Sequence, residues 1–270
     1  MSVGEAARSL LYDGYVRLPD DVQMAAWARS AAKLASQVTQ DMHARADWLR
    51  CAGTWFAGVD VLDNDASGAV GGTPLPDAAL SVIEGLGWQP ESWHRAQVST
   101  VYPGYPQPRE GESDVAARYR QRRDAAHVDG LLPVGPARYR VLAEPHSFIL
   151  GIPLNRVPAQ AGPLVVWQGS HRIMGDALRA ALSRHPEHSW PNLDLTEAYR
   201  AARRTCFETC RRVCVPAQPG EATLLHRHLL HGMSPWDARL ADPGGLGRMV
   251  AYFRPQFASL SEWIGADRYL

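Results

Sequence analysis

Short strands separated by turns dominate the second half of the sequence, and this pattern restricts the possible folds more than any other feature. Apolar or alternating runs of strand length cover 96–102, 147–154, 164–167, 213–215, 221–225 and 248–253. Pro103-Gly104, Gly162-Pro163 and Pro219-Gly220 supply turns between them. Runs this short with such turns predict antiparallel sheets that pack on each other.

The first half has a different pattern, with apolar residues mainly at helical spacing. We expect helices over 6–11, 21–39 and 76–86 with a short strand over 14–18, and further helices over 176–184 and from Thr196, as N-cap, to about Cys210. The segments 60–73 and 109–123 are predicted to be irregular. The predicted fold is mainly β with flanking helices, a double-sheet jelly roll. No linker divides the chain, so we expect one domain over 1–270, with a mostly helical part over 1–95 and a jelly-roll core over 96–255.

Charge and hydropathy argue against two classes of partner. The 28 basic and 28 acidic residues balance, whereas nucleic-acid and membrane-surface proteins are usually basic. The sequence has neither a signal pattern nor an apolar run of membrane-spanning length, so we expect a cytoplasmic protein. Cys206, Cys210 and Cys214 recur every fourth residue. A soft-metal site is one interpretation; small buried side chains at a helix end that runs into a strand are the favoured one.

The segment His127-Val128-Asp129 carries the chemistry. In an extended strand, residues two apart point to the same face, so this imidazole and this carboxylate can reach one metal ion. His231, within Leu230-His231-Gly232, offers the third ligand. Two histidines and a carboxylate on one face of an octahedron leave three positions open, which is typical of iron(II) oxygenases. Two of these positions suit a chelating 2-oxo acid, and one suits dioxygen.

Other histidines compete for the ligand role on sequence grounds alone. His228 lies only three residues before His231, although the Leu-His-Gly context favours His231. His171, in Gly-Ser-His-Arg, is expected to structure a turn instead of binding metal. What distinguishes the His-x-Asp motif from a chance occurrence is the order of the segments that follow it.

In this order the chain resembles the phytanoyl-CoA dioxygenase-like 2-oxoglutarate oxygenases. The matching segments are His127-Val-Asp129, Ala161-Gly-Pro-Leu-Val-Val-Trp-Gln-Gly-Ser-His-Arg172, Pro219-Gly220-Glu221, Leu230-His231-Gly232 and Gly247-Arg248-Met-Val-Ala-Tyr-Phe253. They extend over roughly the second half of the protein. The resemblance implies a double-stranded β-helix, or cupin-like jelly roll. It also implies iron at His127, Asp129 and His231, and a salt bridge from Arg248 to the distal carboxylate of 2-oxoglutarate.

Arg248 suits that role physically, because a guanidinium can bind a carboxylate through two parallel hydrogen bonds. Arg254 is its competitor, since six residues along an extended strand return to the same face. Gln97 and Ser99 share a face of the preceding strand and are further candidates for cosubstrate contacts, although a structural role for polar residues on a strand is the favoured interpretation. Family members often carry a serine two residues after the distal histidine, where this chain has Met233.

The resulting hypothesis is an Fe(II)- and 2-oxoglutarate-dependent dioxygenase that uses dioxygen and releases succinate and CO2. With Asp129 present, hydroxylation of a small-molecule substrate is the default, and desaturation or ring closure are alternatives. Two other classes remain open: a non-catalytic cupin-like protein that binds metal and a small molecule, and a zinc-type enzyme with the same triad. Four arginines in 109–123 give a weak indication of an anionic substrate, and a solvated charged segment is the favoured interpretation; they are Arg118, Arg120, Arg122 and Arg123. The sequence leaves the oligomeric state open.

Overall fold

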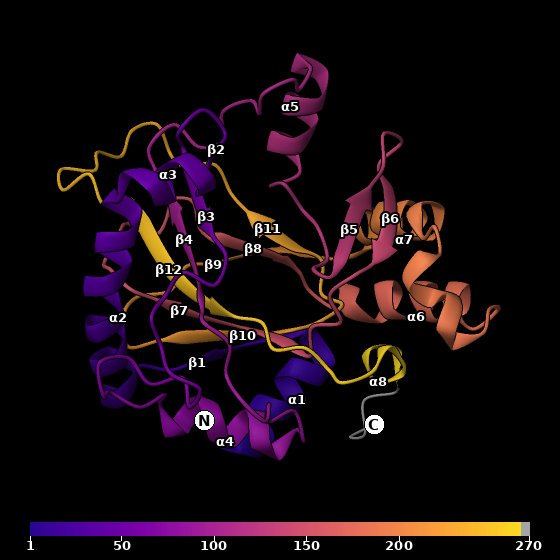
Figure 1. The fold of residues 1–270 in the computed structure, drawn as a ribbon, viewed down its shortest axis with the longest axis horizontal. Coiled ribbons are helices and arrows are strands. Elements are labelled where there is room, and N and C mark those ends of the chain that lie inside the picture. Colours follow the sequence, from indigo (N-terminus) through magenta and orange to yellow (C-terminus); the bar gives the residue numbers. More distant parts are fainter. Residues whose placement is uncertain (266–270) are drawn as a thin grey trace.

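Two antiparallel sheets face each other in the computed structural model, which describes residues 1–265 (Figure 1). The larger sheet has the strand order β1-β10-β7-β12-β4-β3-β2, the smaller has the order β11-β8-β9, and β5 and β6 form a separate hairpin. The strands are β1 (Tyr15–Leu18), β2 (Leu49–Arg50), β3 (Trp55–Gly58), β4 (Gln97–Val101), β5 (Leu131–Val134), β6 (Tyr139–Leu142), β7 (Phe148–Pro153), β8 (Leu164–Trp167), β9 (Arg212–Val215), β10 (Ala222–His226), β11 (His231–Met233) and β12 (Arg248–Phe253).

Most of the helices cover the outer sides of the two sheets, whereas α5 projects away from them at the top of the view (Figure 1). They are α1 (Val3–Asp13), α2 (Val22–Gln40), α3 (Met42–Trp48), α4 (Asp77–Gly85), α5 (Asp114–Arg122), α6 (Ser170–Leu182), α7 (Thr196–Thr209) and α8 (Leu260–Ile264), with a 3-10 helix at Glu187–Asn192. Local sequence sets several of their ends. Asp21 caps α2 by accepting from the Met24 amide, and Ser2 with Glu5 forms a capping box on α1.

Strand β12 shows how alternation divides the larger sheet into two faces. Met249, Ala251 and Phe253 belong to the outer core cluster, which also includes Trp27 of α2. Tyr252 of β12 and Arg254, the residue after the end of β12, line an open cavity on the opposite face. Because residues at even positions share that inner face, the backbone also places Arg248 on it.

The two sheets meet through a small apolar layer and are covered separately outside. Ile149 and Leu225 of the larger sheet pack with Leu164 and Val166 of the smaller one, all of them buried. The other face of β8 contributes Val165 and Trp167 to a cluster with residues of α6 and α7. This arrangement confirms the predicted jelly roll with flanking helices. Part of the larger sheet comes from the N-terminal part, as β1, β2 and β3; the single-domain organisation stays a prediction.

Several local predictions differ from the structure. The segment 109–123, expected to be irregular, contains α5, which Ser113 caps. Thr196 is the first residue of α7 and not its N-cap, because its hydroxyl accepts from the Arg140 amide, and Asp194 caps the Thr196 amide instead. Helix α6 begins at Ser170, six residues earlier than expected, since the buried side chains continue at helical spacing to that point.

The cysteines lie at a helix end that runs into a strand, as the favoured interpretation expects, but only one of the three is buried. Cys206 is buried in α7, Cys210 directly follows the end of that helix, and Cys214 is exposed on β9. Of the side chains described, only the group His127, Asp129 and His231 could together hold a metal ion. None of the helices within 1–265 combines the length and hydropathy that a membrane span requires.

Candidate metal centre

The backbones of His127 and His231 pair directly with each other. The His127 amide donates to the His231 carbonyl at 2.8 Å, and the His231 amide donates to the His127 carbonyl at 3.0 Å. Opposite residues of such an antiparallel pair lie about 5.5 Å apart at Cα and point to the same side. The two imidazoles accordingly lie side by side, with ring centroids 4.6 Å apart. His127 forms only this isolated bridge, so the segment His127-Val-Asp129 is not the extended strand that would place both side chains on one face.

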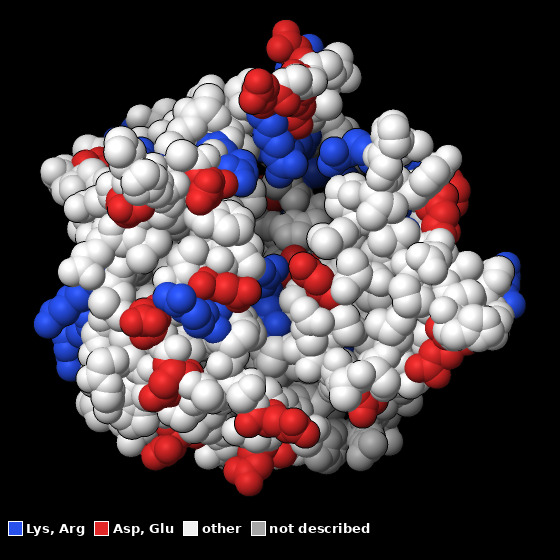
Figure 2. Space-filling view, in the orientation of Figure 1, with Lys and Arg blue, Asp and Glu red and all other residues white. Residues whose placement is uncertain are grey.

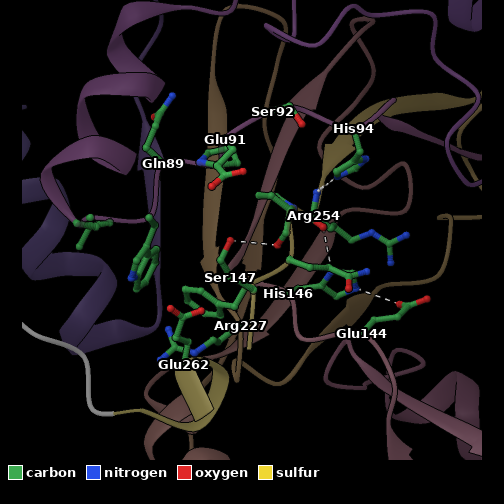
Figure 3. A pocket seen from close by; sticks show the side chains of 18 of the residues that line it. Gln89, Glu91, Ser92, His94, Glu144, His146, Ser147, Arg227, Arg254 and Glu262 are labelled. Atoms are coloured by element: carbon green, nitrogen blue, oxygen red, sulfur yellow. Dashed lines mark hydrogen bonds and ion pairs between the residues drawn. The ribbon is translucent and has the colours of Figure 1, made fainter. Parts of the chain in front are cut away.

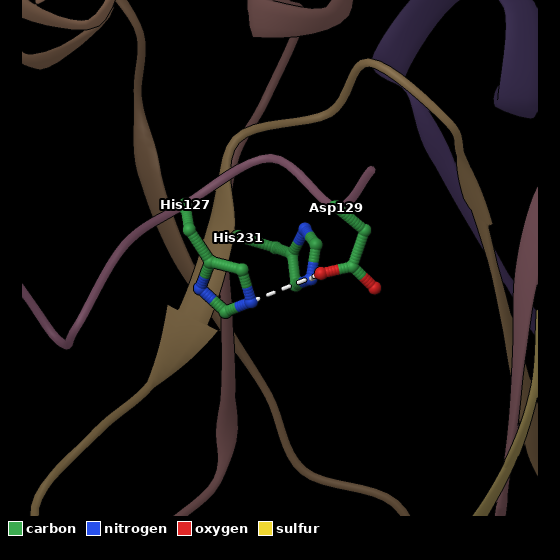
Figure 4. A group of neighbouring side chains, drawn as sticks. All are labelled: His127, Asp129 and His231. Carbon is green, nitrogen blue, oxygen red and sulfur yellow. Dashed lines mark ion pairs between the residues drawn. The ribbon is translucent and has the colours of Figure 1, made fainter. Parts of the chain in front are cut away.

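Asp129 reaches the same point from the turn that follows. Gly130, with φ of 88°, turns the chain into β5, and its carbonyl accepts from the amides of Ala143 and Glu144. A side chain on Gly130 would meet the Glu144 carbonyl oxygen at 2.3 Å, so glycine is required here. The turn directs the Asp129 carboxylate toward both imidazoles (Figure 4).

The three side chains present a donor set that fits a metal ion. Asp129 Oδ1 lies 3.1 Å from His127 Nε2 and 3.8 Å from His231 Nε2. Adjacent ligands of an octahedral ion with bonds of about 2.1 Å are separated by roughly 3 Å, which is close to this spacing. Each Nδ1 bonds a backbone carbonyl, that of Ala125 for His127 and that of Leu229 for His231. Donation from Nδ1 leaves each Nε2 lone pair directed to the centre.

Burial and charge hold two of these groups in the forms that bind metal. Burial lowers the pKa of His231 to about 4, with the nearby His127 adding to the effect, so His231 is neutral at pH 7. Burial alone would raise the pKa of Asp129. The His127 ring, 3.1 Å from Oδ1, and the positive charge of Arg254 outweigh it and hold that pKa well below its usual value. A neutral imidazole and an ionised carboxylate are the ligand forms that a metal requires.

Arg254 holds the carboxylate from its other side. Its guanidinium donates from Nη1 to Asp129 Oδ2 at 3.4 Å, while Oδ1 faces the histidines. The two candidates for a carboxylate clamp thus lie in different places. Arg254 touches a metal-ligand candidate, and Arg248 lies at the other end of β12.

A cavity of about 570 Å³ opens beside the triad. His127, Asp129 and His231 line it, as do the predicted Gln97 and Ser99. Ser99 is already engaged, because its hydroxyl accepts from the Trp55 indole N–H at 3.0 Å. Figure 2 shows this hollow near the middle of the face, beneath α5.

Arg248 does not line the cavity, although it lies on the inner face of β12 next to Val101 of β4. It is 7% exposed. Among residues 1–265 its guanidinium makes neither a hydrogen bond nor an ion pair with another side chain. A buried guanidinium without a partner is costly, so this position suits an anionic group reaching between the sheets.

A second cavity, of about 1030 Å³, adjoins the first one. The two share Val59, Glu144 and Arg254. In Figure 3, Glu144 pairs with His146, and the His94 ring accepts from the Arg254 amide. The metal triad does not line this second cavity.

Sequence reasoning missed the contacts that support the ligands. Asp124, buried, accepts two bonds of 2.7 Å from Arg212 of β9, and its carbonyl accepts from the Met233 amide. Gly232 passes so close to the Asp124 carbonyl that a Cβ would lie 2.1 Å from it. The only sequence sign was the glycine after His231. His228, the alternative ligand, packs instead against Trp263, with ring centroids 4.4 Å apart.

Comparison with known proteins gives a family match around this site. Residues 107–235, just under half of the chain, match the phytanoyl-CoA dioxygenase family, and this segment contains all three members of the triad. The match confirms the resemblance indicated by the sequence motifs and the oxygenase class that goes with it. No curated protein matches the sequence significantly.

Several solved structures are similar over most of the chain. The non-heme alpha ketoglutarate dependent carbocyclase SnoK from nogalamycin biosynthesis is 18% identical, with 99% of this chain and 92% of SnoK covered and a TM-score of 0.46. AviO1 from Streptomyces viridochromogenes Tue57 is 15% identical, with 96% of each chain covered and a TM-score of 0.47. EctD from S. alaskensis with bound Fe is 17% identical, with 94% and 75% covered and a TM-score of 0.46.

Proposed function

We propose that this chain, with its phytanoyl-CoA dioxygenase family segment at residues 107–235, is an Fe(II)- and 2-oxoglutarate-dependent dioxygenase. It hydroxylates a small molecule with release of succinate and CO2. The convergence of His127, Asp129 and His231 at the wall of an open cavity is the observation that carries the proposal. Two imidazoles and one carboxylate leave the remaining metal positions free for cosubstrate and dioxygen.

The residues of this chain would perform distinct tasks. His127 and His231 would bind the metal through Nε2, held in register by their shared backbone bonds. Asp129 would bind through Oδ1, with its other oxygen held by Arg254. Bound iron with 2-oxoglutarate supplies oxidative decarboxylation of the cosubstrate and transfer of an oxygen atom to a C–H bond. The protein holds the reactants in place and limits access of water to them.

Arg248 would bind the distal carboxylate of 2-oxoglutarate. Its burial, its place on the inner face of β12 and the lack of a partner for its guanidinium among residues 1–265 support this role. Gln97 and Ser99 line the cavity on the neighbouring strand and would contact the cosubstrate or the substrate there. Arg254 would act through Asp129 and not as the clamp, because it already contacts that carboxylate.

Anaerobic titration of the metal-free protein with Fe(II) and then 2-oxoglutarate tests this function. We expect the visible charge-transfer band of a chelated 2-oxo acid. Asp129→Ala should abolish it, whereas Glu144→Gln, a change at another carboxylate of the cavity, should retain it. Arg248→Gln should retain Fe(II) binding and weaken 2-oxoglutarate binding at least tenfold, while Arg239→Gln at an exposed site should leave both unchanged.

Each other outcome favours a different class of protein. Iron-loaded, folded protein without the band would exclude the oxygenase and favour a zinc-type enzyme with the same triad. The band without succinate release across a broad substrate screen would favour a non-catalytic binding protein. Loss of 2-oxoglutarate affinity in Arg254→Gln but not in Arg248→Gln would reverse the assignment of the two arginines.

A further inference from the structure

Arginines dominate one side of the cavity beside the metal centre. Seven arginines line it, of which Arg120 and Arg254 already contact carboxylates. The other five are named here the arginine wall: Arg109, Arg123, Arg138, Arg140 and Arg203. Of the acidic residues that the structure describes, Asp129 and Glu144 alone line the same cavity. In Figure 2, basic side chains gather at the upper rim of the hollow, below α5.

The acidic groups nearby are committed to other partners. Asp129 contacts His127 and Arg254, and Glu144 pairs with His146 at 3.0 Å. Glu112 accepts two bonds from the Arg120 guanidinium, at 2.9 and 2.7 Å, and one from the Arg109 backbone amide at 3.0 Å. Within the described part of the chain, no carboxylate pairs with any of the five guanidinium groups of the arginine wall. The positive charge of this surface is therefore uncompensated.

Packing fixes three of these side chains in place. Arg123 and Arg203 both lie over the Phe207 ring, at 4.4 and 5.3 Å from its centroid. Arg140 donates to the Leu131 carbonyl and stacks on Tyr199. Stacking on aromatic faces orients a guanidinium while leaving its N–H edge free to bind.

The arginines also lie close enough to repel one another. Burial lowers the pKa of Arg140, and the positive charges of Arg138 and Arg203 lower it further. An anion that binds between like charges held together in this way relieves their mutual repulsion, and its binding is therefore favoured.

The arginine wall and the metal centre share a short stretch of chain. Arg123 lies four residues before His127, a separation of at most about 14 Å in an extended chain. Leu131, the partner of Arg140, lies two residues after Asp129. A small molecule held on this wall would therefore reach the triad.

We propose that the arginine wall binds an anionic group of the substrate, a phosphate or a carboxylate, and so orients the rest of the molecule toward the metal centre. This inference rests on the proposed function for its substrate, but the anion site itself is independent of turnover. Forked guanidinium groups bind the oxygens of phosphates and carboxylates through paired charge-assisted hydrogen bonds. Several of them together favour such a group over a neutral one.

Calorimetric titration of the metal-free protein with inorganic phosphate and with acetate, at low ionic strength, tests the site. We expect binding of at least one anion, weakened at least tenfold in Arg123→Gln/Arg203→Gln and in Arg140→Gln. The matched control is Arg122→Gln/Arg204→Gln, which removes the exposed arginines next in sequence to Arg123 and Arg203 and should leave binding unchanged. Phosphate binding alone indicates a phosphate ester as the substrate group, and acetate binding alone indicates a carboxylate.

Three results would overturn the inference. The first is that neither anion binds. The second is that the control pair weakens anion binding as much as the wall variants do. The third is that the wall variants weaken 2-oxoglutarate binding tenfold, which would make the wall part of the cosubstrate site. Because the titration needs neither iron nor turnover, it can fail while the charge-transfer band appears, or succeed while that band is absent. The two proposals are thus tested separately.

Discussion

Two glycines next to the metal-ligand candidates are required for different physical reasons. Gly130 adopts a positive φ that L side chains rarely take, and so it turns the chain directly after Asp129. Gly232 has no such constraint on φ, but the backbone of the Asp124 loop passes directly over its Cα. Close approach at Gly232 allows His231 and His127 to share their two backbone bonds.

Gly232→Ala should therefore disturb the metal centre without touching a ligand. The new methyl group would lie 2.1 Å from the Asp124 carbonyl oxygen and 3.1 Å from the Ala126 backbone. We expect a loss of about 1–3 kcal/mol in the free energy of unfolding. We also expect clearly weaker metal binding, measured by calorimetry with Mn(II), which serves as a redox-inert probe of the site. Gly4→Ala, in an open site of α1, should leave both quantities nearly unchanged or slightly raise stability. Equal changes in stability and in Mn(II) binding for the two variants would contradict a role for the close approach of the Asp124 backbone to Gly232.

The three residues of the triad could be predicted from the sequence, whereas the contacts that hold them in place could not. His127, Val128 and Asp129 are adjacent in sequence, and the motif order around His231 gave the third residue. Asp124 and Arg212 form an ion pair across a long stretch of chain, and neither lies in a recognisable pattern. Arg254 was noted only as a competitor, because alternation shows which face a side chain takes but not what it meets there.

At the scale of elements, the loop between α5 and β5 carries two of the three ligand candidates. It has little regular structure, so side chains must fix it in place. Asp124 does so by joining the loop to β9 through Arg212 and to β11 through the Met233 amide. The loop position thus depends on the smaller sheet.

Asp124→Asn should loosen this loop and with it His127. The buried carboxylate accepts both bonds from Arg212, and an amide can accept only one of them. We expect a loss of roughly 2 kcal/mol in stability, and metal affinity roughly tenfold lower, as for other supporting contacts around metals. Asp237→Asn removes a similar pair with the exposed Arg239 and should change little. Unchanged metal affinity in Asp124→Asn would show that the loop is fixed by its backbone alone.

Elements with a buried face were predictable, and elements without one were not. The strands 164–167 and 248–253 were predicted with the bounds observed, because all or nearly all of their side chains are buried. The β5–β6 hairpin was missed, since Leu132, Val134 and Tyr139 are exposed and Pro133 interrupts the pattern. Helix α5 buries no residue fully, and its Ser113 cap and the Arg120–Glu112 pair stabilise it instead.

For the molecule as a whole, buried histidines link stability to pH. Burial holds the pKa of His231 at about 4. Burial also holds the pKa of His228 well below its usual value, and the positive charge of Arg227 lowers the pKa of His228 further. Nε2 of His228 has no hydrogen-bond partner among the residues described. Both groups titrate near pH 6.5 in the unfolded chain. Between pH 6.5 and 4.5 the unfolded state therefore binds more protons than the folded state.

Stability of the metal-free protein should accordingly fall as the pH drops from 6.5 to 4.5. Each histidine contributes up to about 1.4 kcal/mol per pH unit, because the unfolded form gains a proton that the folded form excludes. The carboxyl groups with lowered pKa, among them Asp129 and Glu144, act mainly below this window. Urea unfolding at several pH values in the presence of a chelator measures the slope. His228→Gln should reduce that slope, whereas His188→Gln, at an exposed site, should not. Stability that is flat or rises toward pH 4.5 would mean that these histidines gain protons as readily in the folded protein as in the unfolded chain.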